Sequence, residues 1–177
     1  YIYIYISYMC TQNLARVIST HNSKILNENI PKPATRKCSC PKNTVCPLDG
    51  QCLEKNVVYQ ATVSSSDGAT ETYIGLTAPP FKQRIGNHKK SFKHEAYAHE
   101  TTLSSYIWKL KEKEIDFTIK WKLMARAKPF SPITNVCNLC TKEKHFIIFH
   151  PELATLNHRN EIKSNCRHKE AMLLDNT

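Results

Sequence analysis

The pattern of apolar and polar positions along the chain indicates three β-strands. The clearest runs from Phe117 to Leu123, where Phe, Ile, Trp and Leu alternate with Thr and Lys. Earlier, Val57–Val63 and Thr72–Leu76 are rich in β-branched and aromatic residues, and the dipeptide Asp67-Gly68 lies between them. A period of two is typical of strands, and Asp-Gly favours a tight turn. We predict three strands, of which the first two form an antiparallel hairpin.

Helical spacing of apolar residues predicts four further elements. One begins after Thr77-Ala-Pro-Pro80, which offers a side-chain cap and a proline in the first helical turn. From residue 56 onward the order is β-β-α-α-β-α. This order predicts an α+β fold, with a small three-stranded antiparallel sheet flanked by helices. The predicted helices cover Leu14–Leu26, Phe81–Phe92, Leu103–Glu112 and Asn138–Phe149.

Changes in composition divide the chain into three regions. Residues 1–30 include Tyr1–Ile6, a β-forming run apolar on both faces, and we interpret this region as the tail of an upstream part. Residues 31–55 form a basic, proline-bearing linker and a cysteine knuckle, and residues 56–170 form the α+β domain. Because the first methionine is Met9, we expect a carboxyl-terminal piece of a longer protein. The longest apolar run is about half of a membrane span, so we expect no membrane partner.

Lys and Arg outnumber Asp and Glu by 25 to 15, which gives a net charge of +10. Such a charge favours a polyanionic partner. The segment Phe81–His94 contains no acidic residue, and the tail is also basic. The alternative is a solvated basic surface that only aids solubility. The residues that we expect to contact DNA phosphates, with weak sequence preference, are Lys82, Lys89, Lys90, Lys93 and Arg159.

Seven of the eight cysteines fall into two groups, and Cys10 belongs to neither. Paired cysteines beside histidines, without a recognisable secretory signal, favour metal ligands over disulfides. Cys137-x-x-Cys140 with Cys166-x-His168 supplies four soft ligands, a suitable set for a tetrahedral structural zinc. The alternative for each group is a set of unpaired buried thiols. The second, shorter group, which could close around one more zinc, is Cys38, Cys40, Cys46 and Cys52.

Several polar residues lie where packing alone would favour apolar ones. Tyr59 and Tyr73 are on consecutive predicted strands, although a strand tyrosine is usually a packing residue. Arg84 and His88 are four residues apart and share one helix face, beside an apolar stripe; the alternative is a solvated basic helix. Glu143 falls inside the apolar stripe of its helix, where an unpaired carboxylate is costly.

A cation near Glu143 would offset that cost. A salt bridge to Lys or Arg is one solution, and ligation of Mg²⁺ is the other, since hard cations prefer carboxylate oxygens. Farther along the chain, the side-chain amide of Asn157 could orient a water or a phosphate.

In their order and spacing, these residues resemble the motif residues of the GIY-YIG endonucleases, over roughly Asn56–Asn157. The second motif is present as Tyr73-Ile74-Gly75, whereas Val57-Val58-Tyr59 stands where the family name implies Gly-Ile-Tyr. Valine still suits a strand, and the tyrosine hydroxyl is retained. The segments that are also similar to the endonuclease region of Penelope-like retroelements are Cys46–Cys52, Leu103–Leu110, Cys137–Glu143 and Cys166–His168.

The resemblance implies a phosphodiester hydrolase that cuts DNA with one Mg²⁺ or Mn²⁺ ion at Glu143. Tyr59 would take the proton of the attacking water with help from Arg84, the metal or a relay through His88, and Arg84 would hold the scissile phosphate. Tyr73 would position the phosphate or the water. In such an element the enzyme would nick nuclear target DNA to supply a 3′-hydroxyl primer for integration. Its partners would be an upstream reverse transcriptase domain of the same polyprotein and the element RNA. The alternative is a catalytically inactive, zinc-containing nucleic-acid-binding module or a decayed fragment.

Overall fold

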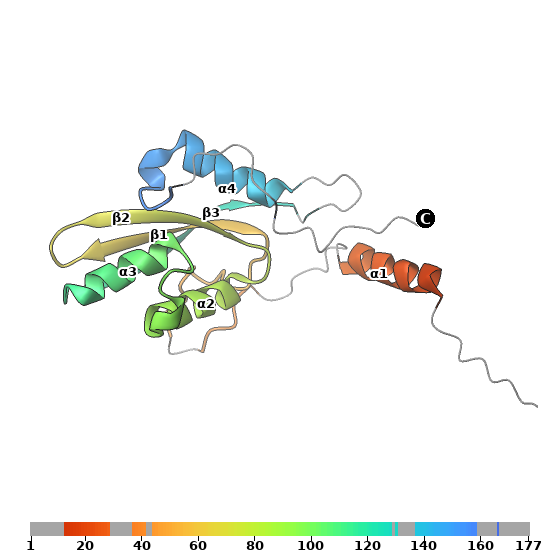
Figure 1. Cartoon of the computed structure of the whole chain (residues 1–177), viewed down its shortest axis with the longest axis horizontal. Coiled ribbons are helices and arrows are strands. Elements are labelled where there is room, and N and C mark those ends of the chain that lie inside the picture. Colours follow the sequence, from red (N-terminus) through yellow and green to blue (C-terminus); the bar gives the residue numbers. More distant parts are fainter. Residues whose placement is uncertain are drawn as a thin grey trace, which may run out of the picture.

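The computed structural model of the chain describes residues 13–28, 37–41, 44–128, 130, 137–158 and 166. These residues form an α+β fold with a three-stranded antiparallel sheet and four α-helices (Figure 1). The predicted fold class is therefore confirmed at this level. The elements are α1 (Leu14–Glu28), β1 (Val57–Ser65), β2 (Thr70–Thr77), α2 (Phe81–Lys93), η1 (Glu95–Tyr97), α3 (Thr102–Glu112), β3 (Phe117–Arg126), α4 (Asn138–Phe149) and η2 (Pro151–Leu153).

The sheet has the order β2-β1-β3, with β1 in the centre. The hairpin of β1 and β2 pairs Tyr59 with Gly75, and β3 pairs antiparallel with the other edge of β1. Between Val58 and Tyr59 the pairing with β3 shifts, because Val58 faces Ala125 whereas Tyr59 faces Leu123. Such a bulge bends a strand and re-aims its side chains, and bulges are common next to active sites.

Helices cover both faces of the sheet, so the molecule has three layers (Figure 1). On one face, α2 and α3 pack on β1 and β3, and the core there includes Tyr59, Phe81 and Leu103. On the other face α4 packs on β2 and β1 through Leu139 and Ile147. Helix α1 lies apart from the sheet (Figure 1). No helix in the described part of the chain is long and apolar enough to span a membrane.

The prediction that a side chain of Thr77–Pro80 caps α2 is wrong. The Thr77 hydroxyl donates to the carbonyl of Pro79 at 3.0 Å, and the capping position is Pro80, which has no side-chain donor or acceptor. Instead, the amide of Phe81 donates to the carbonyl of Glu54 and the amide of Lys82 donates to the carbonyl of Cys52. The cap thus comes from the cysteine segment, which the local sequence of α2 does not reveal.

The cysteine segment packs on the α+β domain. Leu48 is 4% exposed and belongs to the same core cluster as Tyr59, while Cys52 is completely buried. Arg126 at the end of β3 forms an ion pair with Glu54 at 3.3 Å. The predicted division at residues 55 and 56 therefore separates two segments that share one core. The predicted features at Tyr1–Ile6, Arg159 and His168 lie outside the described residues.

Candidate active site and cysteine clusters

The hydroxyl of Tyr59 joins two residues of helix α2. It accepts a hydrogen bond from Nε of Arg84 at 2.9 Å and lies 2.7 Å from Nε2 of His88. All three side chains meet on one face of the sheet. Tyr59 of β1 points to this face, and α2, which covers it, supplies the other two residues. The four-residue spacing of Arg84 and His88 brings both to the same hydroxyl, as a shared helix face requires.

Burial determines which group donates in the hydrogen bond between Tyr59 and His88. Burial, followed by the positive charge of Arg84, lowers the pKa of His88 to about 3. His88 is therefore neutral at pH 7, and its Nε2 can accept a hydrogen bond. Burial raises the pKa of Tyr59, and Tyr73 and Glu143 add to the rise while Arg84 opposes it. The resting hydroxyl thus accepts from Arg84 and donates to His88.

Aromatic rings enclose the imidazole of His88, which is 2% exposed. The ring of Phe92 stacks on it with centroids 5.8 Å apart, and Trp121 from β3 lies 5.4 Å away at an angle of 33°. These contacts hold the ring plane toward Tyr59. They also remove water from the imidazole, and loss of hydration disfavours its charged form.

Gly75 leaves the space that the Tyr59 ring occupies. A Cβ atom built on Gly75 would lie 2.6 Å from the Tyr59 hydroxyl oxygen and 2.9 Å from a ring carbon of Tyr73. Both distances are far below van der Waals contact, so any side chain here would displace a tyrosine. The glycine of the Tyr73-Ile74-Gly75 motif is thus required by the packing of the two strands.

A cleft of about 560 Å³ lies along the β2 edge of the sheet. Tyr73 and Leu76 of β2 form its floor, while Arg84 of α2 and Glu143 of α4 line walls that come from opposite faces of the sheet. Tyr59 does not line this cleft and is completely buried. Arg84 is therefore the group that connects the Tyr59 hydroxyl with the open space.

Glu143 is half-buried and shares a helix face with the buried Leu139 and Ile147. The negative charge of Glu143 adds to the raised pKa of the Tyr59 hydroxyl. Among the described residues, the groups of three or more close metal-binding side chains consist of cysteines alone. A hard cation at Glu143 would have one carboxylate ligand and would take its remaining ligands from water and phosphate, as Mg²⁺ commonly does.

Asn157 binds the backbone of strand β2. Its Oδ1 accepts from the amide of Ile74 at 2.8 Å, and its Nδ2 donates to the carbonyl of Ile74 at 2.9 Å. The amide of Leu156 adds a bond to the carbonyl of Thr72. The segment after η2 thus continues the hydrogen bonding along the β2 edge, one residue before Gly75. In this structure the Asn157 amide supports the strand that carries Tyr73.

The lysines predicted to contact DNA are all exposed on α2. The ammonium of Lys82 donates to the carbonyl and the hydroxyl of Ser39, both at 3.0 Å. Lys90 lies over the ring of Tyr97 at 4.2 Å. Gln83 and Asn87 line the cleft, and Lys90 lies on the same helix face one turn beyond the cleft, because the three residues are spaced four and three apart.

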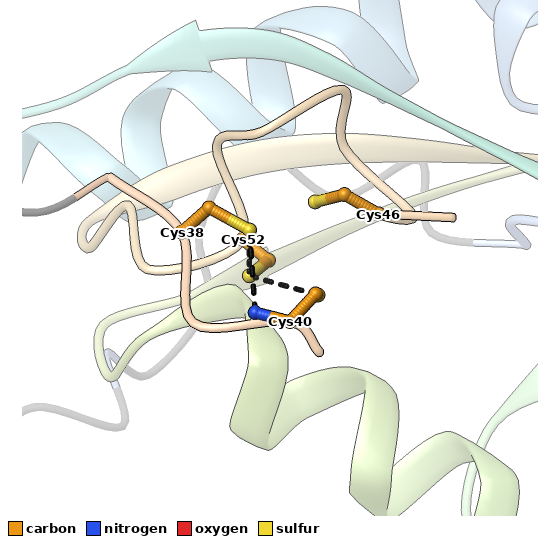
Figure 2. Close-up of side chains that lie close together, drawn as sticks. All are labelled: Cys38, Cys40, Cys46 and Cys52. Carbon is orange, nitrogen blue, oxygen red and sulfur yellow. Dashed lines mark hydrogen bonds between the residues drawn. The ribbon is translucent and has the colours of Figure 1, made fainter. Parts of the chain in front are cut away.

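The four cysteines of the first group converge on one point (Figure 2). The sulfur atoms of Cys38, Cys40, Cys46 and Cys52 all lie within 4.8 Å of one another. Cys52 Sγ is 3.6 Å from Cys38 Sγ and 3.6 Å from Cys40 Sγ. Zinc–sulfur bonds of about 2.3 Å in a tetrahedron place sulfurs about 3.8 Å apart, whereas a disulfide needs about 2.0 Å. The cluster can hold a metal ion such as zinc.

The thiols of this cluster are in unequal surroundings. Partial burial acts to raise the pKa of Cys46, but backbone hydrogen bonds from Leu48 and Gly50 lower it to about 6. The hydrogen bond with Cys52 and partial desolvation raise the pKa of Cys40 to about 12. One thiolate is thus stabilised by the loop itself, while further ionisation of the crowded sulfurs needs a cation.

The second group meets at the start of α4. The sulfurs of Cys137, Cys140 and Cys166 lie within 4.8 Å of one another, and Cys140 Sγ is 3.6 Å from Cys166 Sγ. This arrangement brings residue 166 against the first turn of the helix that carries Glu143. The three cysteines can also hold a metal ion. The predicted fourth ligand, His168, lies outside the described residues.

Other residues of the cleft were not singled out from the sequence. They include Asn87, one turn after Arg84, and Thr101 and Ser105 near the start of α3. His99 and His158 also line the cleft, although the sequence pattern gave them no role. The position of Asn87 on the face of Arg84 is a signal that could have found it. Nothing in the local sequence places residues 99–105 opposite Glu143.

Comparisons with models of protein families, with curated proteins and with solved structures find no match for this chain.

Proposed function

We propose that the chain is a metal-dependent DNA endonuclease with the fold and site of the GIY-YIG family. The observation that carries the proposal is the Tyr59 hydroxyl, which joins Arg84 to His88 beside a cleft that Tyr73 and Glu143 also line. A cation, a phenol and a carboxylate at one cleft, with a second phenol hydrogen-bonded to the cation, are groups that can hydrolyse a phosphodiester. They come from α2, from strands β1 and β2, and from α4.

Arg84 binds the scissile phosphate in this proposal. A guanidinium has five N–H donors, so it can serve Tyr59 through Nε and still hold phosphate oxygens. Its charge stabilises the negative charge that builds on these oxygens in the transition state. Tyr73 positions the phosphate or the attacking water from the cleft floor.

In this proposal Tyr59 and His88 move the proton of the attacking water, which must reach the Tyr59 hydroxyl beside Arg84 because Tyr59 is buried and does not line the cleft. Because burial keeps the resting Tyr59 hydroxyl protonated, it can accept a proton only while it releases its own. The neutral imidazole of His88, 2.7 Å away, receives that proton at Nε2. In the resting state the same hydroxyl fixes the orientation of Arg84, and Asn157 fixes the strand that carries Tyr73.

Glu143 is the residue that would hold Mg²⁺ or Mn²⁺. Bound there, the ion would supply Lewis-acid stabilisation of the departing oxygen. Zinc at the two cysteine clusters would be structural. The one cluster lies beside the start of α2 and the other at the start of α4, so both support helices that carry site residues.

The retroelement origin rests on the sequence motifs. The similarity of Cys46–Cys52 and Cys137–Glu143 to Penelope-like endonucleases supports a role in nicking target DNA for primed integration in the nucleus. On this proposal an upstream reverse transcriptase domain and the element RNA are partners. The exposed lysines of α2 provide the contacts to the DNA backbone.

A nicking assay on supercoiled plasmid tests the proposal. We expect Mg²⁺-dependent conversion to the open-circular form by the wild-type chain, and no conversion by Arg84→Ala, whose folding is checked by circular dichroism. Retained cleavage in Arg84→Ala would contradict the assigned site. Tight DNA binding without cleavage by the wild-type chain at any Mg²⁺ or Mn²⁺ concentration would favour the inactive binding module instead.

A further inference from the structure

Helix α2 begins without a cap of its own. The first amides of a helix have no partner within the helix, and here Pro80 provides no side-chain acceptor. The amides of Gln83 and Arg84 reach the Pro80 carbonyl at 2.9 and 3.4 Å. The two amides before them depend on residues outside the helix. Phe81 N donates to Glu54 O at 3.0 Å, and Lys82 N donates to Cys52 O at 2.7 Å.

The residues that accept these bonds belong to the first cysteine cluster or follow it directly. Cys52 contributes its carbonyl to α2 and its sulfur to the cluster. At the other end of the cluster, Ser39 lies between Cys38 and Cys40 and accepts two bonds from the Lys82 ammonium. The start of α2 is therefore hydrogen-bonded to both ends of the cysteine segment.

Leu48 and Cys52 anchor the cysteine segment in the core, but no regular secondary structure orders the described part of the loop between and around them. Its turn uses positive φ angles at Asp49 and Gly50. Fixing such a loop costs conformational entropy for every residue. A metal ion bound by four thiolates would offset this cost, because metal binding free energy becomes folding free energy in small sites of this kind.

We propose that zinc bound by Cys38, Cys40, Cys46 and Cys52 caps helix α2 and so holds Arg84 and His88 in contact with Tyr59. A zinc ion with four thiolates also carries net negative charge. Negative charge near the amino terminus of a helix is favourable, because the free N–H groups there are partly positive. The catalytic consequence rests on the proposed nuclease function, whereas the effect on α2 does not.

Hydrogen exchange of the full chain, followed by mass spectrometry, tests the effect on α2 directly. The variant Cys38→Ser/Cys46→Ser replaces two partly exposed ligands and leaves the buried Cys52 in place. We expect it to lose one zinc ion per chain by elemental analysis. We also expect exchange at the start of α2 to become about tenfold faster, the size of effect that loss of a helix cap produces. Chelation of wild-type zinc should have the same effect on α2, and added Zn²⁺ should reverse it.

Two matched variants show which helix responds. Cys140→Ser removes a ligand of the second cluster and should speed exchange at the start of α4 while α2 stays protected. Cys10→Ser should leave zinc content and both helices as in the wild type. Unchanged α2 exchange in Cys38→Ser/Cys46→Ser, or unchanged zinc content in that variant, would overturn the inference. If hydrogen exchange at the start of α2 depends on zinc but the wild-type chain cuts no DNA, the proposed nuclease function is wrong while the inference about the helix cap is upheld.

Discussion

Tyr59 has its ring against Phe81 and Trp121, with centroids 5.0 and 5.8 Å away, and its hydroxyl between Arg84 and His88. The two preceding residues, Val57 and Val58, are completely buried core residues, so valine suits both positions of this strand. In the proposed nuclease, the first motif therefore depends on its tyrosine, and the strand requires only β-forming neighbours.

Gly75 offers a sharp test at this scale. Gly75→Ala places a methyl group 2.6 Å from the Tyr59 hydroxyl, so we expect the free energy of unfolding to fall by about 1–3 kcal/mol through overpacking. Cleavage should be lost, because Tyr59 must leave Arg84. Gly86→Ala is the control, since nothing lies within 4 Å of that site in α2. It should raise the free energy of unfolding by about 0.5–1 kcal/mol. Equal stabilities in urea denaturation would contradict the packing described for Gly75.

His88 should make the free energy of unfolding decrease at acidic pH. Its pKa is about 3 in the folded state, because of burial and Arg84, and about 6.5 when exposed. Between these values the unfolded chain binds the proton and the folded chain does not, so stability is full above pH 6.5 and falls as the pH decreases toward 3. The limiting loss is about 1.4 kcal/mol for each pH unit.

Comparison with His88→Gln isolates this effect, because cysteine protonation at the clusters affects both proteins alike. Urea denaturation between pH 7 and pH 4.5 should give a steeper decline for the wild-type chain. Parallel curves for the two proteins would show that His88 is not buried in its neutral form.

Helix α2 combines three tasks, since it carries site residues, packs on the sheet and exposes lysines. Its boundaries and its polar face could be predicted, because the spacing of Phe81, Ile85 and Phe92 is local information. Its cap could not be predicted, since the acceptors at Cys52 and Glu54 reach it only after the cysteine segment folds back. For the same reason, the sequence placed Arg84 and His88 on one face but could not show that both meet Tyr59.

Salt dependence of DNA binding tests the basic face of α2. Lys89 and Lys93 are exposed and one turn apart, as are Lys109 and Lys113 at the end of α3. If the first pair contacts phosphates, Lys89→Gln/Lys93→Gln should reduce the log–log slope of affinity against salt by about 1.8, since each contact on duplex DNA contributes about 0.9. Fluorescence anisotropy with unrelated duplexes measures the slope. Lys109→Gln/Lys113→Gln has the same charge change and should keep the wild-type slope; an equal effect of both pairs would mean that net charge alone drives binding.

At the scale of the whole molecule, the cleft depends on the order of the layers. Helices α2 and α4 lie on opposite faces of the sheet, so Arg84 and Glu143 can face one space only at the β2 edge. The order β-β-α-α-β-α predicts the sheet and its helices. The order of elements does not show where the cleft lies along β2. That position depends on the segment at Leu156 and Asn157, which binds to β2 only in the folded chain.

Glu143→Gln separates the proposed metal ligand from the packing of the cleft, because it changes one charge on the cleft wall and keeps the shape of the side chain. We expect the rate of Mg²⁺-dependent cleavage, measured under single-turnover conditions, to fall at least about a hundredfold, while affinity for the same DNA stays within a few fold. Glu112→Gln, an exposed residue of α3 outside the cleft, makes the same charge change and should cleave at the wild-type rate. Cleavage by Glu143→Gln at the rate of Glu112→Gln would contradict the account of this cleft as a nuclease site.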